Sequence, residues 1–221
     1  MPEANKEIVA LSDHEHVLLR STMYVGSVDI SDEKIPVIKD GRIVMETKQI
    51  SVGFYKMFNE ILDNSIDEAK RMNGKMKSIS VIIDSKTNQV SIEDTGGGFY
   101  KGTELNKKTG LTNIETAMSQ LRAGSNFKND DTAEALIGTN GVGAALVNML
   151  STKFTIETTN KDAYFFKEWN NFEPKPNVVR KGKQSNTGTT ITYIPRKDVF
   201  KKAKGDRAII NSLLLLKTNL L

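Results

Sequence analysis

Apolar side chains recur along the chain with two different spacings. On both sides of Asp40-Gly41 they alternate with polar residues over 35–51, the pattern of a β-hairpin with a tight turn. The same alternation predicts further strands over 79–84, 89–94, 153–159, 163–169, 177–181 and 189–195. Helical spacing predicts helices over 54–72, 111–124, 144–150 and 206–221. Ser12-x-x-Glu15 has the form of a capping box, which predicts a short helix over 13–20.

The order of these elements mixes helices with strands, and polar turns join most neighbouring strands. Strands connected by short turns pair antiparallel, and amphipathic helices bury their apolar side against such a sheet. The sequence therefore predicts an α+β fold, a two-layer sandwich in which a mixed, mainly antiparallel sheet carries helices on one face.

Composition narrows the kinds of chemistry. The 221 residues contain no cysteine and two histidines, so disulfides, thiol nucleophiles and cysteine-based zinc sites are excluded. No apolar run approaches the roughly 20 residues of a membrane span, and the first residues lack the basic-then-apolar order of a signal peptide. We expect a cytoplasmic protein without a membrane partner. The net charge of +4 is compatible with a polyanionic partner and equally with a solvated basic surface.

The helix predicted over 54–72 carries a polar stripe. On a helical wheel one arc is apolar, formed by Phe54, Phe58, Ile61, Leu62 and Ala69. The opposite arc is polar, formed by Glu60, Asn64, Asp67 and Arg71, with Glu68 beside them. Periodicity alone would equally fit an ordinary amphipathic helix whose polar face is solvated. However, aspartate, asparagine and serine in mid-helix cost stability relative to lysine or alanine, which indicates a functional site.

Two residues of this stripe suggest a specific reaction. Glu60 and Asn64 are four residues apart, so their side chains are neighbours on one helix face. A glutamate can orient or deprotonate a water, and an amide oxygen can bind Mg²⁺ without adding charge. A base and a metal ligand one turn apart suit hydrolysis of a phosphoanhydride.

Two glycine clusters have properties that suit a nucleotide. Gly138, Gly141 and Gly143 precede a predicted helix, the local order of a phosphate-binding loop, although ordinary turn glycines would give the same spacing. Asp94 ends a predicted strand and is followed by Gly96 and Gly98. Its carboxylate can accept a hydrogen bond from the amine of adenine, and glycines let a planar base approach the backbone. A tight turn with aspartate at its first position is the alternative.

Taken in order, these motifs resemble one superfamily. NEILDNSIDEA, IEDTGGGF, GTNGVGAALVN and NTGTTITYIP are similar to the motifs of the Bergerat (GHKL) ATPases, which include type II topoisomerases, MutL proteins, ninety-kilodalton heat-shock chaperones and histidine kinases. MYVGS and AGSNF favour the topoisomerase branch over MutL-type and chaperone-type ATPases. The mixture of bacterial and eukaryotic features resembles the topoisomerases of T4-like bacteriophages, which implies a bacterial host cell.

The resemblance implies a role for each matching position. Glu60 would be the general base, Asn64 the Mg²⁺ ligand, and Asp94 the adenine-binding acid, assisted through a water by Thr189. Ser125 and Asn126 would contact the ribose. The phosphate loop would comprise Thr139, Asn140, Gly141, Val142, Gly143 and Ala144.

The resemblance also implies an organisation and a set of partners. Residues 1–20 would form a dimerisation arm, 21–203 the ATPase domain, and 204–221 the start of a helix linking to a transducer domain. ATP·Mg would bring two copies together and close a gate on duplex DNA, while other domains and subunits cleave the DNA. The family's γ-phosphate lysine, in a Gln-Thr-Lys motif, has no match, so slow hydrolysis is expected.

Some positions depart from the family's pattern. Gyrase places an arginine where this chain has Gly97, so that arginine cannot pair with the acid at Glu68, and the role of Glu68 is open. A basic DNA-binding module without ATPase activity is the alternative outside the superfamily. It would use the clusters Arg180-Lys181-x-Lys183 and Lys201-Lys202-x-Lys204.

Overall fold

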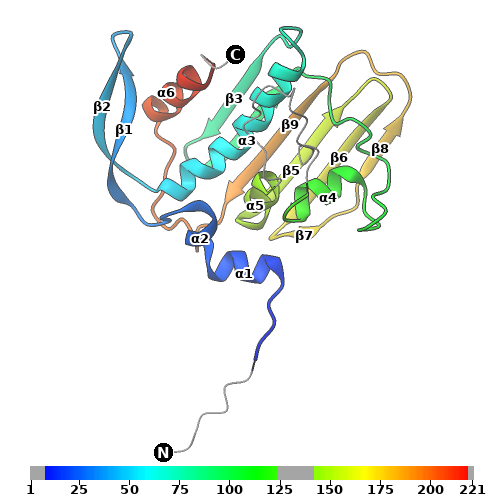
Figure 1. Ribbon diagram of the computed structural model, residues 1–221, viewed down its shortest axis with the longest axis horizontal. Coiled ribbons are helices and arrows are strands. Elements are labelled where there is room, and N and C mark those ends of the chain that lie inside the picture. Colours follow the sequence, from blue (N-terminus) through cyan, green and yellow to red (C-terminus); the bar gives the residue numbers. More distant parts are fainter. Residues whose placement is uncertain (1–7, 124–141, 219–221) are drawn as a thin grey trace, which may run out of the picture.

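The computed structural model describes residues 8–123 and 142–218, and its main feature is a seven-stranded sheet (Figure 1). The strands lie in the order β3-β4-β9-β5-β6-β7, and β8 also pairs with β6. Every pairing between these described strands is antiparallel. The bounds are β3 (Ile79–Asp84), β4 (Gln89–Asp94), β5 (Ser151–Thr159), β6 (Ala163–Asn170), β7 (Glu173–Pro174), β8 (Val178–Lys181) and β9 (Gly188–Pro195).

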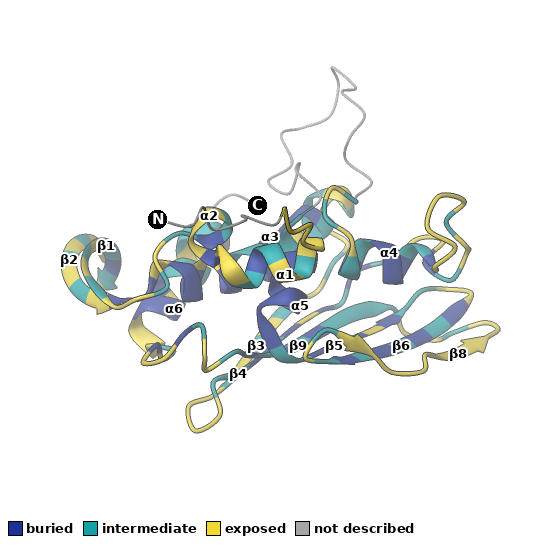
Figure 2. Cartoon of the chain, turned by 90° about the horizontal axis from the view of Figure 1, so that it is seen from below, coloured by how far each residue is buried: buried dark blue, intermediate teal, exposed yellow. Residues whose placement is uncertain are grey.

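Helices cover one face of this sheet, as Figure 2 shows from the side. They are α1 (Asp13–Leu19), α2 (Ser21–Val25), α3 (Val52–Arg71), α4 (Asn113–Ser119), α5 (Gly143–Met149) and α6 (Arg207–Thr218). The core between the layers contains Phe58, Leu62 and Ile66 of α3 together with Phe154 and Tyr193 of the sheet. The predicted two-layer α+β fold is confirmed. Helix α3 packs on the sheet, and Ser65 of α3 contacts Asp94 at the end of β4.

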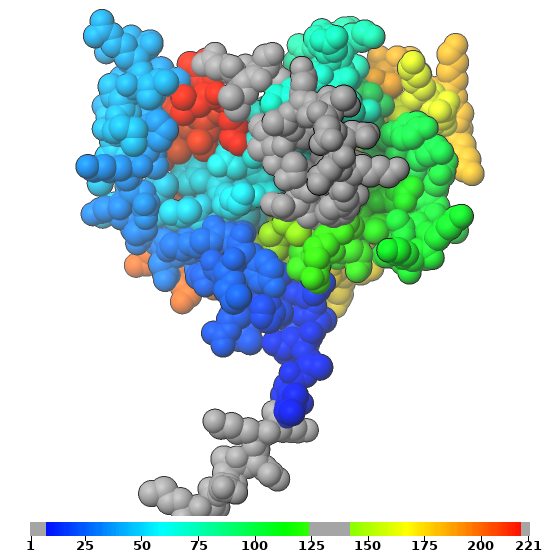
Figure 3. All heavy atoms as spheres, in the orientation of Figure 1, coloured from blue at the N-terminus to red at the C-terminus, as the bar shows by residue number. Residues whose placement is uncertain are grey.

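A hairpin stands apart from the main sheet. It consists of β1 (Ser31–Lys39) and β2 (Arg42–Ile50), which pair in register around Asp40 and Gly41, as predicted. Both turn residues have positive φ, 49° and 71°, the geometry of a tight two-residue hairpin turn. The Ser212 hydroxyl accepts a hydrogen bond from the Ile38 N–H at 2.9 Å and so ties the hairpin to α6. Figure 3 shows the red atoms of α6 beside the blue atoms of the hairpin.

Some boundaries and faces differ from the prediction. The helix predicted over 111–124 is α4, which ends at Ser119 because Gln120 has an extended backbone. On α3, Asp67 is buried rather than part of a solvated stripe, and Ala69 is only half-buried. The short elements α2 and β7 were not predicted, because five and two residues are too few to show a period.

Candidate functional site

Helix α3 supplies the polar residues of the site. The helix begins where the Ser51 side chain caps the Phe54 N–H, and it runs for 20 residues to Arg71. Its apolar residues face the sheet, and this burial fixes the rotation of the helix. Glu60 and Asn64 therefore project from the side of α3 that the sheet does not cover.

Glu60 lies against the start of α5. Its carboxylate forms an ion pair with Lys56, one turn earlier on α3. A Cβ added at Gly143 would overlap the Glu60 carboxylate and would stand only 3.0 Å from its Cδ. Only glycine fits at Gly143 with Glu60 in this position. The last glycine of the GTNGVG cluster is thus brought into contact with the predicted general base.

Asn64 is exposed one turn further along α3. Among the described residues its amide has no hydrogen-bond partner, so its oxygen is available to a ligand. Within the same part of the chain, no group of three histidine or acidic side chains could hold a metal ion by itself. An amide oxygen supplemented by phosphate oxygens is a donor set that fits Mg²⁺, so the residues present fit a nucleotide-bound ion.

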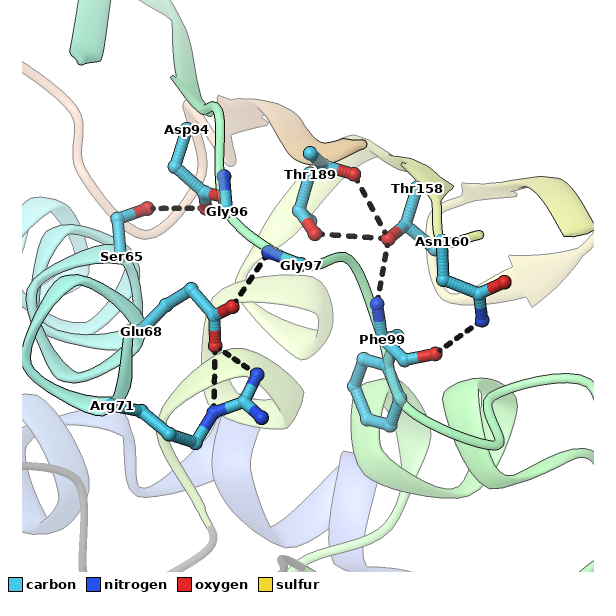
Figure 4. A network of polar contacts seen from close by, with 11 residues as sticks. Ser65, Glu68, Arg71, Asp94, Gly96, Gly97, Phe99, Thr158, Asn160 and Thr189 are labelled. Carbon is cyan, nitrogen blue, oxygen red and sulfur yellow. Dashed lines mark hydrogen bonds and ion pairs between the residues drawn. The ribbon is translucent and has the colours of Figure 1, made fainter. Parts of the chain in front are cut away.

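Asp94 ends β4 and points back toward α3 (Figure 4). Its side chain is buried, with 6% of the residue exposed, and both carboxylate oxygens accept hydrogen bonds. The Gly96 N–H donates to Oδ1 at 2.9 Å and the Ser65 hydroxyl to Oδ2 at 3.0 Å. Burial raises the pKa of Asp94 above its ordinary value, an effect opposed by the hydrogen bonds from Gly96 and Ser65 and reinforced by the negative charge of Glu68.

Glu68 connects α3 to the glycine turn that follows Asp94. Its Oε1 accepts the Gly97 N–H at 2.7 Å, and its Oε2 accepts the Arg71 Nε–H at 2.9 Å (Figure 4). The arginine that the family pattern places at position 97 is absent, and Arg71 from the same helix is the partner of Glu68 instead. A Cβ at Gly96 would overlap Glu68 and lie 2.8 Å from Asp94 Oδ1, so the protein's own packing requires glycine there.

A second set of contacts fixes the other side of the turn. Thr158 of β5 contacts Thr189 of β9 and accepts the Phe99 N–H, while the Asn160 amide donates to the Phe99 carbonyl at 3.0 Å (Figure 4). Gly98 has a φ of +72°, and a Cβ there would lie 2.6 Å from the Thr159 carbonyl carbon. Packing against this chain therefore requires glycine at Gly98 as well.

The predicted site residues fall into several groups. The structure brings together those near the end of β4, namely Glu68, Asp94, Gly96 and Thr189, and Gly98 lies in the same glycine turn. Glu60 and Asn64 lie earlier on α3, the helix that also carries Glu68. Val142, Gly143 and Ala144 lie at the start of α5, where Gly143 packs against Glu60. The remaining residues, Ser125, Asn126, Thr139, Asn140 and Gly141, lie outside the described residues, and their roles stay predictions.

Sequence reasoning missed three side chains of the site. Ser65 and Arg71 contact the predicted acids Asp94 and Glu68, and Thr158 contacts Thr189. Arg71 was placed on the polar arc without a role, and its three-residue spacing from Glu68 was an available signal. Nothing in the sequence separates Ser65 and Thr158 from ordinary helix and strand residues.

Residues 49–198 match the protein family described as histidine kinase-, DNA gyrase B-, and HSP90-like ATPase. The matched segment contains Glu60, Asn64, Asp94 and Thr189 and covers more than half of the chain. The chain belongs to this family.

No helix in the described part of the chain is long and apolar enough to cross a membrane.

Relatives within the family are type II topoisomerases. The chain is 34% identical to DNA topoisomerase 2 of Drosophila melanogaster over 204 residues, which is 90% of this chain and 14% of that protein. It is 33% identical to DNA topoisomerase 2 of Arabidopsis thaliana over 188 residues, 83% of this chain and 12% of that protein. The chain thus spans about one seventh of the length of these relatives.

Solved structures place the similarity in one region of such enzymes. The ATPase region of Saccharomyces cerevisiae topoisomerase II has a TM-score of 0.82 and 26% identity, covering 96% of this chain and 57% of that one. The ATPase and transducer domains of DNA topoisomerase II from Balamuthia mandrillaris have a TM-score of 0.80 and 27% identity. This match covers 95% of the present chain and 55% of that one. The chain is homologous to the N-terminal ATPase region of type II topoisomerases.

Proposed function

We propose that this chain binds ATP·Mg and hydrolyses ATP by cleaving the bond to its γ-phosphate. The observation that carries the proposal is that a single helix, α3, presents the predicted hydrolytic residues and also holds the predicted adenine-binding acid. Near its middle it presents Glu60 and Asn64. Ser65, the next residue, holds Asp94, and Glu68, one turn beyond Asn64, holds the glycine turn. Because α3 is rigidly packed in the core, these two sets of residues are fixed relative to each other.

The base would be recognised at the end of β4. Asp94 retains acceptor capacity after its bonds to Ser65 and Gly96, so it can accept a hydrogen bond from an exocyclic amine. Thr189 pairs with Asp94 across the β4–β9 register and lies beside it. We infer that these two residues bind adenine, and that Gly96 and Gly98 carry the backbone along the edge of the base.

Hydrolysis would take place at the other end of the site. Glu60 accepts a proton from the attacking water, and Lys56 beside it keeps the carboxylate paired until then. Asn64 would hold Mg²⁺, which neutralises charge on the phosphates when it is bound. Residues 139–144 would wrap the phosphates, with Gly143 against Glu60, and Ser125 and Asn126 would contact the ribose.

The longer relatives suggest the setting in which this activity operates. Because they are DNA topoisomerase 2, we infer that the chain acts as the ATPase part of a type II topoisomerase. In this proposal ATP binding pairs two copies through residues 1–20, and hydrolysis drives passage of a DNA duplex in the cytoplasm. DNA cleavage belongs to other domains or subunits.

The test is to measure ATP turnover and nucleotide binding side by side for Glu60→Gln. We expect the variant to bind ATP within about threefold of the unmodified chain and to lose at least about 100-fold in turnover, the usual contribution of a general base. Glu104→Gln is the matched control, because Glu104 also lies near a lysine, Lys101, but far from α3 in sequence. Turnover by Glu60→Gln equal to that of the control would remove Glu60 from this role.

A further inference from the structure

Three polar side chains form one row across the sheet. Asp94 of β4 is paired in register with Thr189 of β9, and Thr189 is paired in register with Thr158 of β5. Residues paired in register project from the same face of a sheet. That face is the one covered by the helices, since Asp94 and Thr158 are both buried, with 6% and 3% of each residue exposed.

The Oγ1 atom of Thr158 takes part in three hydrogen-bond contacts. The Phe99 N–H donates to this Oγ1 at 3.1 Å. The Gly188 carbonyl oxygen lies 3.2 Å from Oγ1, and the Thr189 Oγ1 lies 2.9 Å from it. The hydroxyl is buried, so solvent does not compete for these contacts.

A hydroxyl carries a single proton and two lone pairs, which limits how these contacts can be arranged. A carbonyl oxygen can only accept, so the contact with Gly188 requires the Thr158 proton. The contact with Thr189 must then be donated by the Thr189 hydroxyl. Only this assignment satisfies all three contacts, and it uses the single proton of Thr189.

The consequence is that Thr189 can offer only lone pairs to a ligand or to a bridging water. Asp94 beside it also acts as an acceptor through both oxygens, since Gly96 and Ser65 donate to them. The end of the row at Asp94 and Thr189 therefore presents acceptors and no donor. A ligand whose edge carries an amine would donate hydrogen bonds to these acceptors. A ligand whose edge carries a carbonyl oxygen would place that oxygen against their lone pairs, and the buried acceptors would be left without a donor.

We propose that Thr158 is a specificity-determining positioning residue, which orients the Thr189 hydroxyl so that the site accepts a 6-aminopurine and rejects a 6-oxopurine. This inference rests on the proposed nucleotide-binding function. Thr158 itself does not touch the base. It acts by withholding the proton that Thr189 would otherwise present to the ligand.

Thr158 also has a structural role that the experiment must separate from this one. By accepting the Phe99 N–H it holds the end of the glycine turn against β5. Loss of that hydrogen bond alone would weaken the binding of every purine nucleotide by the same factor. The informative quantity is therefore the ratio of two dissociation constants, for nucleotides that differ only at position 6 of the base.

The experiment is calorimetric titration of the chain with ADP and with IDP in the presence of Mg²⁺, for the unmodified chain, Thr158→Val and Thr158→Ser. Valine keeps the shape of threonine and removes the hydroxyl, and serine keeps the hydroxyl. Thr155→Val is the matched control, because Thr155 lies on the same strand, three residues away on the opposite face, and contacts the Thr192 carbonyl. Thermal unfolding of each variant verifies that it is folded.

We expect the unmodified chain, Thr158→Ser and Thr155→Val to prefer ADP over IDP to a similar extent. In Thr158→Val the ratio of the two dissociation constants should fall by about fivefold to tenfold, the scale of one hydrogen bond. An unchanged ratio in Thr158→Val, or an unmodified chain that binds ADP and IDP equally, would overturn the inference and leave the nucleotide site standing. Absence of any binding by the unmodified chain would overturn the proposed function and this inference together.

Discussion

Gly143 and Glu60 are packed so closely that a Cβ at position 143 would overlap the Glu60 carboxylate where it now lies. The contact joins the first residue of α5 to the middle of α3, 83 positions earlier in the chain, and it occurs at the carboxylate proposed to activate water. This glycine of the predicted phosphate loop is thus explained by the side chain beside it. The contact makes the position of Glu60 depend on the start of α5.

Gly143→Ala should therefore displace the Glu60 carboxylate and reduce ATP turnover by about 100-fold, since small misplacements of a catalytic group have effects of that size. Gly205→Ala is the control, because a Cβ there meets Ile83 at an ordinary 3.4 Å. Steady-state hydrolysis measures the difference. Turnover by Gly143→Ala within threefold of the control would contradict the role of this contact in positioning Glu60 for hydrolysis.

Lys217 of α6 forms an ion pair with Asp63, the residue before Asn64 on α3. Burial raises the pKa of Asp63, Lys217 opposes this rise, and the charges of Glu60 and Asp67 add to it. Lys217→Met should destabilise the fold at pH 7 by about 2 kcal/mol, because it leaves a buried carboxylate unpaired.

The deficit of Lys217→Met should shrink as the pH falls toward 4. Below its raised pKa Asp63 is neutral and needs no counter-charge, so the loss of Lys217 then costs little. Urea unfolding at pH 7 and pH 4.5 measures both effects. In the double variant Asp63→Asn, Lys217→Met most of the stability at pH 7 should return, and a deficit that grows on acidification would show that the pair does not stabilise the fold.

Glu68 should be replaceable by an uncharged acceptor. Its ion pair with Arg71, whose side chain is 58% exposed, is worth little in water, whereas its bond from the Gly97 N–H is half-buried. Glu68→Gln should stay within about 0.5 kcal/mol of the unmodified chain, and Glu68→Ala should lose about 1–2 kcal/mol. Equal losses in the two variants, measured by urea unfolding, would show that the charge matters more than the acceptor.

Asp94 should be a residue retained for function at a cost in stability. Its raised pKa means that the folded chain holds this proton more tightly than the unfolded chain, so its contribution to stability falls as the pH rises above the ordinary carboxyl range. Asp94→Asn lacks this penalty. Relative to the unmodified chain, the variant should gain stability between pH 4 and pH 7, and a loss over that interval would contradict the assignment of the shift to burial.

The elements with a clear period could be predicted from the sequence. The strand over 89–94 and the helix over 54–72 lie within two residues of β4 and α3, because alternation and helical spacing directly reflect burial on one face. The helix over 111–124 was predicted too long, since apolar spacing continues past Ser119 while the backbone at Gln120 turns extended. Local patterns do not contain the tertiary contacts that end a helix.

The site shows the same division. Glu60, Asn64 and Asp94 could be proposed from residue type and spacing, because their chemistry is unusual for their positions. The long-range contacts around them could not be found in this way. Lys217 contacts Asp63 across 154 positions, and Thr158 contacts Phe99 across 59, so both contacts follow from the three-dimensional fold alone.

The most direct test of the account is calorimetric titration with a non-hydrolysable ATP analogue and Mg²⁺, for the unmodified chain and for Asp94→Asn. Glu93→Gln is the control, since Glu93 precedes Asp94 on β4 and is exposed on the opposite face. The account predicts one nucleotide per chain for the unmodified protein and the control, and at least a 100-fold loss of affinity for Asp94→Asn. Binding by Asp94→Asn as tight as that of the control would contradict it, because the nucleotide would then be held elsewhere.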